Sequence, residues 1–288
     1  MSTAVEVTVQ AISAVVQTVP IGTNLALVHI LWVMMSGAFL PGRGAFFTAF
    51  DAKGFDKQVV RRSWAALRHG AWTSNELLDN WQIYVASENH WRVRRHERYQ
   101  AVSVDMTGFW RPHLKGWAGK HFHHAWHHLV LAQTHVSADA ATFSIYAYPD
   151  PLYKHALVLA TDLGKIKVET PYHIYRDRWP VEQPPLAAKQ MIGLHRQFVF
   201  ARDSCFRLPE LSLIDGAILT YAAAVMPPVP SGFWDRTPQA TPGRLRRLLD
   251  KADFPTFLSD DPQIRKKDSV TAHLPKGIEA HRRLKRAA

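Results

Sequence analysis

Hydrophobic and polar positions in residues 56–87 alternate with helical spacing. A first helix is predicted over residues 56–69, followed by Gly70 as its end. Thr73-Ser-Asn-Glu76 forms a capping box, which predicts a second helix directly after it. The apolar positions that define the two helices are Val59, Val60, Trp64, Leu67, Leu77, Leu78, Trp81 and Val85. We therefore expect two helices joined by a short turn that contains glycine.

This pair of helices permits two interpretations. The first helix carries Arg61, Arg62 and Arg68, and a helix pair with a basic member is typical of helix-turn-helix DNA readers. An ordinary helical hairpin with a solvated basic face has the same pattern. The segment Trp91–Tyr99 (WRVRRHERY) adds four arginines, a composition suited to binding phosphates. The pattern alone leaves both interpretations open.

Two apolar segments are predicted to be core helices. Residues 7–42 carry no charge, but Pro20, Gly22 and Asn24 interrupt them. Residues 24–40 are shorter than the roughly 20 apolar residues of a membrane span and follow no basic region, so a buried helix is favoured over a membrane anchor or a signal-like segment. Residues 208–226 predict a second buried helix, which Pro227 and the prolines after it end.

The middle of the chain contains β-prone runs. Residues 101–105 end in Asp105, and further strands are expected over 129–134, 143–148 and 156–160. Residues beyond 231 form a basic tail with little periodicity, which is either a solvated charge run or a nucleic-acid-contacting tail. The pattern divides the chain into a helical region 1–97, a mixed region 98–230 and the tail 231–288.

Charge and composition narrow the classes of partner. The net charge of +11 and the pI near 9.9 favour polyanions, chiefly nucleic acid, with an acidic membrane surface as second choice. The single Cys205 excludes an intramolecular disulfide and a cysteine-rich zinc site. Five histidines gather between His121 and His128, where helical i,i+4 pairs would suit zinc. Without a cysteine or glutamate to complete the set, surface histidines are the better interpretation.

The segment 175–189 (YRDRWPVEQPPLAAK) has the most informative spacing. At roughly 100° per residue, an ideal helix would place Tyr175, Arg178, Glu182 and Lys189 on one stripe about 60° wide. Such a stripe suits a phosphodiester and a divalent cation, whereas the alternative is a salt-bridged surface helix. The carboxylate of Asp105 at a strand end can also ligate Mg²⁺.

The prolines in this segment modify that geometry. Pro184 and Pro185 lack an N–H donor and would clash with the carbonyls four residues earlier in a continuous helix. We expect a turn or kink between Glu182 and Leu186, with Lys189 on a second helical segment that continues to about Phe200.

These residues carry a family resemblance. The Tyr-Arg-Glu-Lys spacing, the Asp105-x-Thr107 strand end and the strand 160–163 (ATDL) resemble the YREK group of DDE insertion-sequence transposases. The phrases RWPVEQPPLAAKQMIGLHRQFV, RLPEL, GFWDR and TPGRLRR are similar to one subgroup of that family, as is GRGAFF…VVRRSWAAL…GAW near the N-terminus. The resemblance covers nearly the whole chain.

The resemblance implies an α/β fold, leaning towards α+β, with an RNase H-like core on a mixed sheet and an N-terminal helical domain. Three carboxylates of that core would hold two Mg²⁺ ions, or Mn²⁺, for phosphodiester hydrolysis and strand transfer. By position, Asp105 matches the first carboxylate and Glu182 the third. Tyr175, Arg178 and Lys189 match residues that contact the DNA.

The same resemblance implies the partners and the location of the protein. Its partner would be double-stranded DNA at transposon ends, with a homodimer compatible with that role and no membrane partner. Its location would be the bacterial cytoplasm, in association with the nucleoid.

One part of the family pattern is missing. Only 76 residues (106–181) separate Asp105 from Glu182, and no stretch among them resembles the second aspartate motif. Asp162 resembles a later position, and Asp150, flanked by prolines, is the only weak candidate. We therefore expect a degenerate transposase with an internal deletion, a truncated core and impaired catalysis. The alternatives are a non-catalytic DNA-binding protein that occupies transposon ends and a basic protein anchored to a membrane by residues 24–40.

Overall fold

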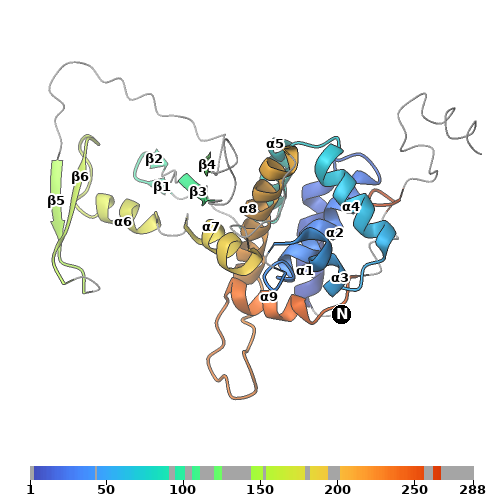
Figure 1. The fold of residues 1–288 in the computed structure, drawn as a ribbon. Helices are drawn as coiled ribbons and strands as arrows, with labels where there is room; N and C mark the ends of the chain where they lie inside the picture. The colour runs from blue at the N-terminus through green and yellow to red at the C-terminus, as the bar shows by residue number, and fades with distance from the viewer. Residues whose placement is uncertain are drawn as a thin grey trace, which may run out of the picture.

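In the computed structural model, a bundle of helices lies beside a group of short strands and one further helix (Figure 1). The structure describes only part of the chain, and within 106–110 and 120–124 it describes only the backbone. The described residues are 3–42, 44–90, 95–100, 106–110, 120–124, 144–151, 154–178, 182–193, 202–255 and 262–266.

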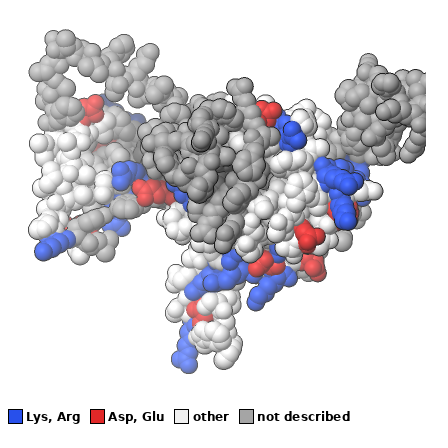
Figure 2. Space-filling model, viewed as in Figure 1, with Lys and Arg blue, Asp and Glu red and all other residues white. Residues whose placement is uncertain are grey.

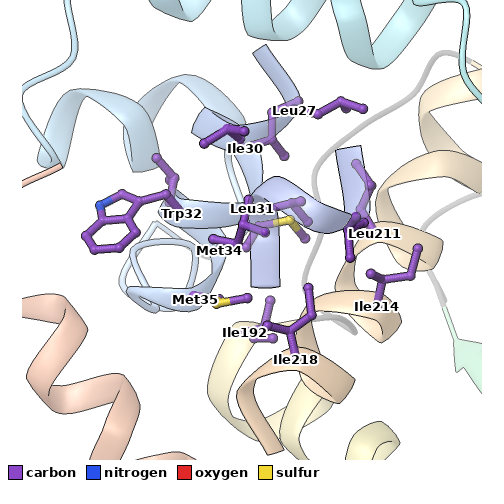
Figure 3. Close-up of a cluster of buried hydrophobic side chains, with 14 of the residues drawn as sticks. Leu27, Ile30, Leu31, Trp32, Met34, Met35, Ile192, Leu211, Ile214 and Ile218 are labelled. Atoms are coloured by element: carbon purple, nitrogen blue, oxygen red, sulfur yellow. The ribbon is translucent and has the colours of Figure 1, made fainter. Parts of the chain in front are cut away.

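The bundle is built around helix α2, and every residue of α2 from Asn24 to Met35 is buried. A helix that is apolar on all sides must be surrounded by other elements, and α2 contacts α1, α4 and α8. Figure 3 shows Leu31 and other α2 side chains lying toward Leu211, Ile214 and Ile218 of α8. The predicted burial of the apolar N-terminal segment is confirmed. The bundle consists of α1 (Thr3–Val16), α2 (Thr23–Met35), α3 (Phe46–Ala52), α4 (Lys57–His69), α5 (Ser74–Ser87), α7 (Gln183–Ala187), the π-helical turn η3 (Ala188–Ile192), α8 (Arg202–Val225) and α9 (Pro242–Asp250).

Local sequence signals define α4 and α5 as predicted. Asp56 caps α4 by accepting bonds from the backbone N–H groups of Gln58 (2.7 Å) and Val59 (2.9 Å), and Gly70 follows its last residue. The Thr73 hydroxyl accepts a bond from Glu76 N at the start of α5 (3.2 Å). Each helix then packs on a different neighbour, α4 on α2 and α5 on α1, and both contact α8. The turn between α4 and α5 therefore joins two helices that pack on different neighbours within one core.

The C-terminal region contributes to the same core. Residues 208–226, predicted as a buried helix, lie almost entirely within α8 and provide many buried side chains. Residues 242–250 lie in the predicted basic tail of little periodicity, and they form helix α9. Leu245 and Leu249, four residues apart on one helical face, are both buried, and this apolar spacing explains why α9 packs on the bundle.

Residues 262–266 also pack against the bundle. The Asn24 side chain donates to the carbonyl of Gln263 (2.6 Å), and the backbone N–H of Gly22 donates to the carbonyl of Arg265 (3.0 Å). Ile264 is buried between these two contacts. One hydrophobic cluster therefore unites side chains such as Leu31, Leu211 and Leu249, although they come from three predicted regions. The boundaries at 97/98 and 230/231 stay predictions.

The strands that the structure describes form three separate antiparallel pairs. Strand β1 (Arg95–His96) pairs with β2 (Tyr99–Gln100), β3 (Met106–Trp110) with β4 (Lys120–His124), and β5 (Ser144–Tyr148) with β6 (Leu157–Thr161). The chain is thus a mixture of helix and strand, as the α/β or α+β class requires. The strands expected over 143–148 and 156–160 are confirmed as β5 and β6.

Other predictions in this region fare differently. Residues 121–124 form strand β4, so the helix on which the histidines would pair for zinc, already the less favoured interpretation, does not form there. His127 and His128 lie outside the described residues, as do the expected strands at 101–105 and 129–134. Helix α6 (Thr170–Asp177) follows β6 and contacts both β1 and β6.

One helix in the described part of the chain, Asp203–Val225, is long and apolar enough to cross a membrane. Most of that segment is buried inside the bundle. The buried core helix of a soluble protein passes the same test of length and composition.

Candidate functional site

The four residues of the Tyr-Arg-Glu-Lys spacing lie on two separate helical segments. Tyr175 is in α6, and Arg178 is the residue at which α6 ends. Residues 179–181 lie outside the described residues. Glu182 is the N-terminal cap residue of α7, and Lys189 lies in the π-helical turn η3 that continues α7. The single stripe of an ideal helix is therefore divided between Arg178 and Glu182.

The expected kink between Glu182 and Leu186 is wrong. Pro184 and Pro185 lie in the first turn of α7, where backbone N–H groups have no partner within the helix, so proline costs no hydrogen bond there. The chain is helical from Glu182 to Ile192, and Gly193 ends it with a φ of 84°. Glu182 and Lys189 thus share one helical run, which stops well before Phe200.

Arg178 links the two segments of the site. Its guanidinium carbon lies 5.5 Å from the centroid of the Tyr175 ring, and its Nη2 atom lies 4.0 Å from Oε1 of Glu182. The side chains of Arg178 and Glu182 are 54% and 44% exposed, respectively. Ion pairs with such exposure contribute on the order of 0.5 kcal/mol. Both charged groups therefore remain available to an incoming ligand.

Helix α7 is seated closely on α8. A Cβ atom at Gly216 would lie 2.5 Å from the carbonyl oxygen of Pro184 and 2.9 Å from the backbone nitrogen of Ala188. Only glycine permits that separation without a shift of backbone. The contact ties the Glu182 segment to the central helix of the bundle.

The π-helical turn extends this attachment. Ile192 at its end is buried in the main hydrophobic cluster (Figure 3), and Met191 lies beside Gly243 of α9. Single π-turns occur often at functional sites. Lys189 is partly buried in this turn, seven residues after Glu182.

The predicted metal ligands are only partly placed. Asp105 lies outside the described residues, while Glu182 presents a half-exposed carboxylate whose hard oxygens suit Mg²⁺. In the described part of the chain, no group of three or more His, Cys, Asp or Glu residues is arranged to hold a metal ion.

Asp150, the weak candidate for the missing ligand, is buried and already has polar partners. Its Oδ2 atom accepts a hydrogen bond from the Tyr172 hydroxyl at 2.7 Å and lies 3.4 Å from Nη1 of Arg176. Both partners belong to α6. The carboxylate thus joins the end of β5 to α6, and metal ligation would have to compete with these contacts. Asp162, beyond β6, is exposed.

A second set of contacts holds α6 against the β1–β2 turn. His96 Nε2 lies 2.8 Å from Oδ2 of Asp177. The Glu97 carboxylate accepts bonds from the Thr170 hydroxyl (2.6 Å) and the Lys167 N–H (2.7 Å), and these bonds lower the pKa of Glu97. Sequence reasoning missed these pairs, because their members are 70 to 81 positions apart and no local pattern marks them.

A buried carboxyl group lies beside the glycine contact. Asp215 of α8 is fully buried, and neither of its carboxyl oxygens has a hydrogen-bond partner within the described structure. Burial raises the pKa of Asp215 well above its ordinary value. Its position in an apolar run (LSLIDGAIL) was visible in the sequence, but its burial without a partner was not.

Comparison of the chain with protein-family models, curated proteins and solved structures found no match.

Proposed function

We propose that the protein is a degenerate DDE-type transposase that binds the ends of insertion-sequence DNA and cleaves them weakly. The observation that carries this proposal is the Arg178–Glu182 contact, which brings two half-exposed groups of opposite charge together beside Tyr175. A guanidinium suits a phosphate, and a carboxylate suits a divalent cation. The net charge of +11 supports DNA as the partner.

Within this proposal each residue has a distinct task. Glu182, with Asp105, would hold Mg²⁺ or Mn²⁺, and the bound metal would supply activation of water or a 3′-hydroxyl and stabilisation of the leaving oxygen. Arg178 and Lys189 would bind phosphates near the scissile bond. The Tyr175 ring would orient the guanidinium of Arg178. The finer fold, a truncated RNase H-like core on a mixed sheet, is part of this proposal.

The incomplete ligand set supports impaired catalysis. Two carboxylates, Asp105 and Glu182, have an assigned role, while Asp150 is engaged with Tyr172 and Arg176. Poor placement of the metal raises the activation barrier of cleavage, and each increase of about 1.4 kcal/mol in that barrier lowers the rate about tenfold.

The test is a binding and cleavage assay of the full chain on duplexes that carry the inverted repeats flanking its own locus. We expect retardation of the DNA that weakens with salt, and little cleavage in Mg²⁺ or Mn²⁺. Robust double-strand cleavage that Asp105→Ala abolishes would show that catalysis is intact. Failure to bind any of the duplexes at low salt would overturn the DNA-binding proposal.

A second candidate function is a non-catalytic protein that occupies transposon ends. The engagement of Asp150 within its own fold favours this reading, because Asp150 is the one candidate that the sequence offered for the third carboxylate. Glu182→Gln separates the two functions. If the protein only binds, the variant should retain full affinity and cleavage should be absent in both proteins; if weak cleavage exists, the variant should lose it.

A further inference from the structure

The segment between α8 and α9 projects away from the bundle as an extended loop (Figure 1). An antiparallel bridge between Val229 and Gln239 closes its base. Phe233 and Trp234 lie within the loop with exposed fractions of 97% and 68%. Their ring centroids are 4.9 Å apart at an interplanar angle of 80°. Large aromatic groups in water on a projecting loop indicate a contact surface.

Polar contacts hold the turn in one conformation. Oδ2 of Asp235 accepts bonds from the backbone N–H (2.9 Å) and the hydroxyl (3.0 Å) of Ser231. Arg244 of α9 lies 2.8 Å from the same oxygen and donates to the Val229 carbonyl (3.2 Å). The indole of Trp234 lies against Gly232, where an added Cβ would come within 2.7 Å of the ring. These contacts hold the turn that carries Phe233 and Trp234 in one conformation, and such preorganisation lowers the entropy cost of binding a ligand.

The charge around the aromatic pair is positive. The acid in the turn, Asp235, is paired with Arg244, whereas Arg236 beside the aromatic residues is exposed. Arg247 of α9 is also exposed, about one and a half turns after the loop enters that helix at Pro242. Figure 2 shows Lys and Arg atoms both at the end of this projection and where it meets the bundle. The surface of the loop thus combines the aromatic rings of Phe233 and Trp234 with basic side chains next to them.

We infer that Phe233 and Trp234 form a stacking element for unpaired bases of DNA. This inference rests on the proposed DNA-binding function and adds the structural class of DNA that this loop recognises. Aromatic faces with basic neighbours are the combination that binds single-stranded nucleic acid, because every base has a π-face and every nucleotide a phosphate. Bases within an intact duplex are already stacked, so the element should select forked or distorted ends. A lipid surface is the less favoured partner, since the loop residues around the pair are Pro, Ser, Gly, Asp, Arg, Thr and Gln rather than aliphatic side chains.

The test compares two fluorescein-labelled DNAs of the same length, one fully paired and one with a forked, unpaired end, by anisotropy with the full chain. We expect the wild type to bind the fork about tenfold more tightly, as one stacked base would provide. The double variant Phe233→Ala/Trp234→Ala should lose this preference and keep its affinity for the paired duplex. Trp234→Phe, which keeps an aromatic ring, should retain most of the preference. Phe47→Ala, which truncates another exposed aromatic residue, should change neither affinity.

A second readout reports the stacking itself. A 2-aminopurine base in the unpaired segment should be quenched when the wild type binds and not when the double alanine variant binds. Equal binding of both DNAs by wild type and variant would overturn this inference and leave the proposed function intact. Absence of binding to either DNA would defeat the proposed function together with the inference. Sedimentation with phosphatidylserine vesicles that depends on Phe233 and Trp234, without the fork preference, would assign the loop to a lipid surface instead.

Discussion

Gly216 of α8 lies against the carbonyl oxygen of Pro184 at a distance that leaves no room for a methyl group. An added Cβ would approach that oxygen to 2.5 Å and the Ala188 nitrogen to 2.9 Å. Both neighbours are backbone atoms, which cannot rotate away as a flexible side chain can. The position of the Glu182 segment on the bundle thus depends on a hydrogen atom at residue 216.

Gly216→Ala should therefore destabilise the protein. The added methyl group forces α7 away from α8, and overpacking of this kind costs about 1–3 kcal/mol. Urea unfolding followed by circular dichroism measures the loss. Gly164→Ala is the matched control, because the nearest atom to its added Cβ is the end of the Arg98 side chain at 3.7 Å. Equal stability of the two variants would contradict the close seating of α7.

Asp215→Asn should stabilise the protein at neutral and alkaline pH. Burial raises the pKa of Asp215 well above its ordinary value, so the folded protein holds this proton to a higher pH than the unfolded chain, which releases it above about pH 4. The wild type therefore loses stability as pH rises above that value, and the amide variant avoids this loss. The urea midpoint of unfolding should be higher for Asp215→Asn than for the wild type, and this difference should be larger at pH 8 than at pH 5. The exposed Asp253→Asn should show no such pH-dependent gain, and a variant at 215 that is destabilised equally at both pH values would refute the protonated state.

His29 should produce the opposite pH dependence. Phe55 and Phe254 enclose it, with ring centroids 5.2 and 4.7 Å away, and burial with nearby Arg62 and Lys266 lowers its pKa to about 4. The unfolded chain takes up a proton near pH 6.5 whereas the folded protein does not, so stability is full above pH 6.5 and falls as pH drops toward 4.

The loss from His29 should reach on the order of 3 kcal/mol at about pH 4. Urea unfolding of wild type and His29→Leu at pH 4.5 and 7 measures it, with the variant expected to lose less stability than the wild type on acidification. Parallel pH profiles for the two proteins would show that His29 does not titrate in this window.

Arg207 of α8 should be irreplaceable by lysine. Its guanidinium donates to the carbonyls of Leu67 (3.1 Å) and Gly70 (3.0 Å) and lies 4.8 Å from the Trp72 ring centroid. A lysine ammonium lacks the planar fork that serves both carbonyls and the ring. Arg207→Lys should lower the free energy of unfolding by about 1–3 kcal/mol, measured in urea. The exposed Arg247→Lys should change the free energy of unfolding by less than about 0.5 kcal/mol. A similarly small effect at 207 would show that the guanidinium does not stabilise the turn between α4 and α5.

Arg178→Ala tests the proposed contact with phosphate. If the guanidinium binds DNA, the variant should bind duplexes more weakly, and the slope of log K against log salt should fall by about one. Fluorescence anisotropy at several salt concentrations measures both quantities. Lys154→Ala removes one exposed charge in the turn between β5 and β6 and serves as the control. Equal slopes and affinities for the two variants would place Arg178 outside the DNA contact.

The sequence by itself determined the helices whose signals are local. Asp56 and Thr73 cap α4 and α5 through bonds to residues two or three positions away, so a short window of sequence contains all the required information. The burial of α2 followed from its uncharged apolar sequence, because a helix at the protein surface needs a polar face and this run has none. Strands β5 and β6 were similarly evident from β-prone runs, whereas their antiparallel pairing was not predicted.

The tertiary structure alone decided the features that depend on distant partners. The prolines at 184 and 185 excluded a continuous helix from Tyr175 to Lys189, but only the fold placed the break before Glu182 and seated α7 on Gly216. Asp150 is held by Tyr172 and Arg176 of another element, and the tail contains a helix because Leu245 and Leu249 meet an apolar surface of the bundle. The hydrogen bonds within a helix join residues that are close in the sequence, so a local pattern can predict them. The contacts of Gly216, Asp150 and Leu249 join residues from distant parts of the chain, and they stabilise the protein only after those parts have packed together.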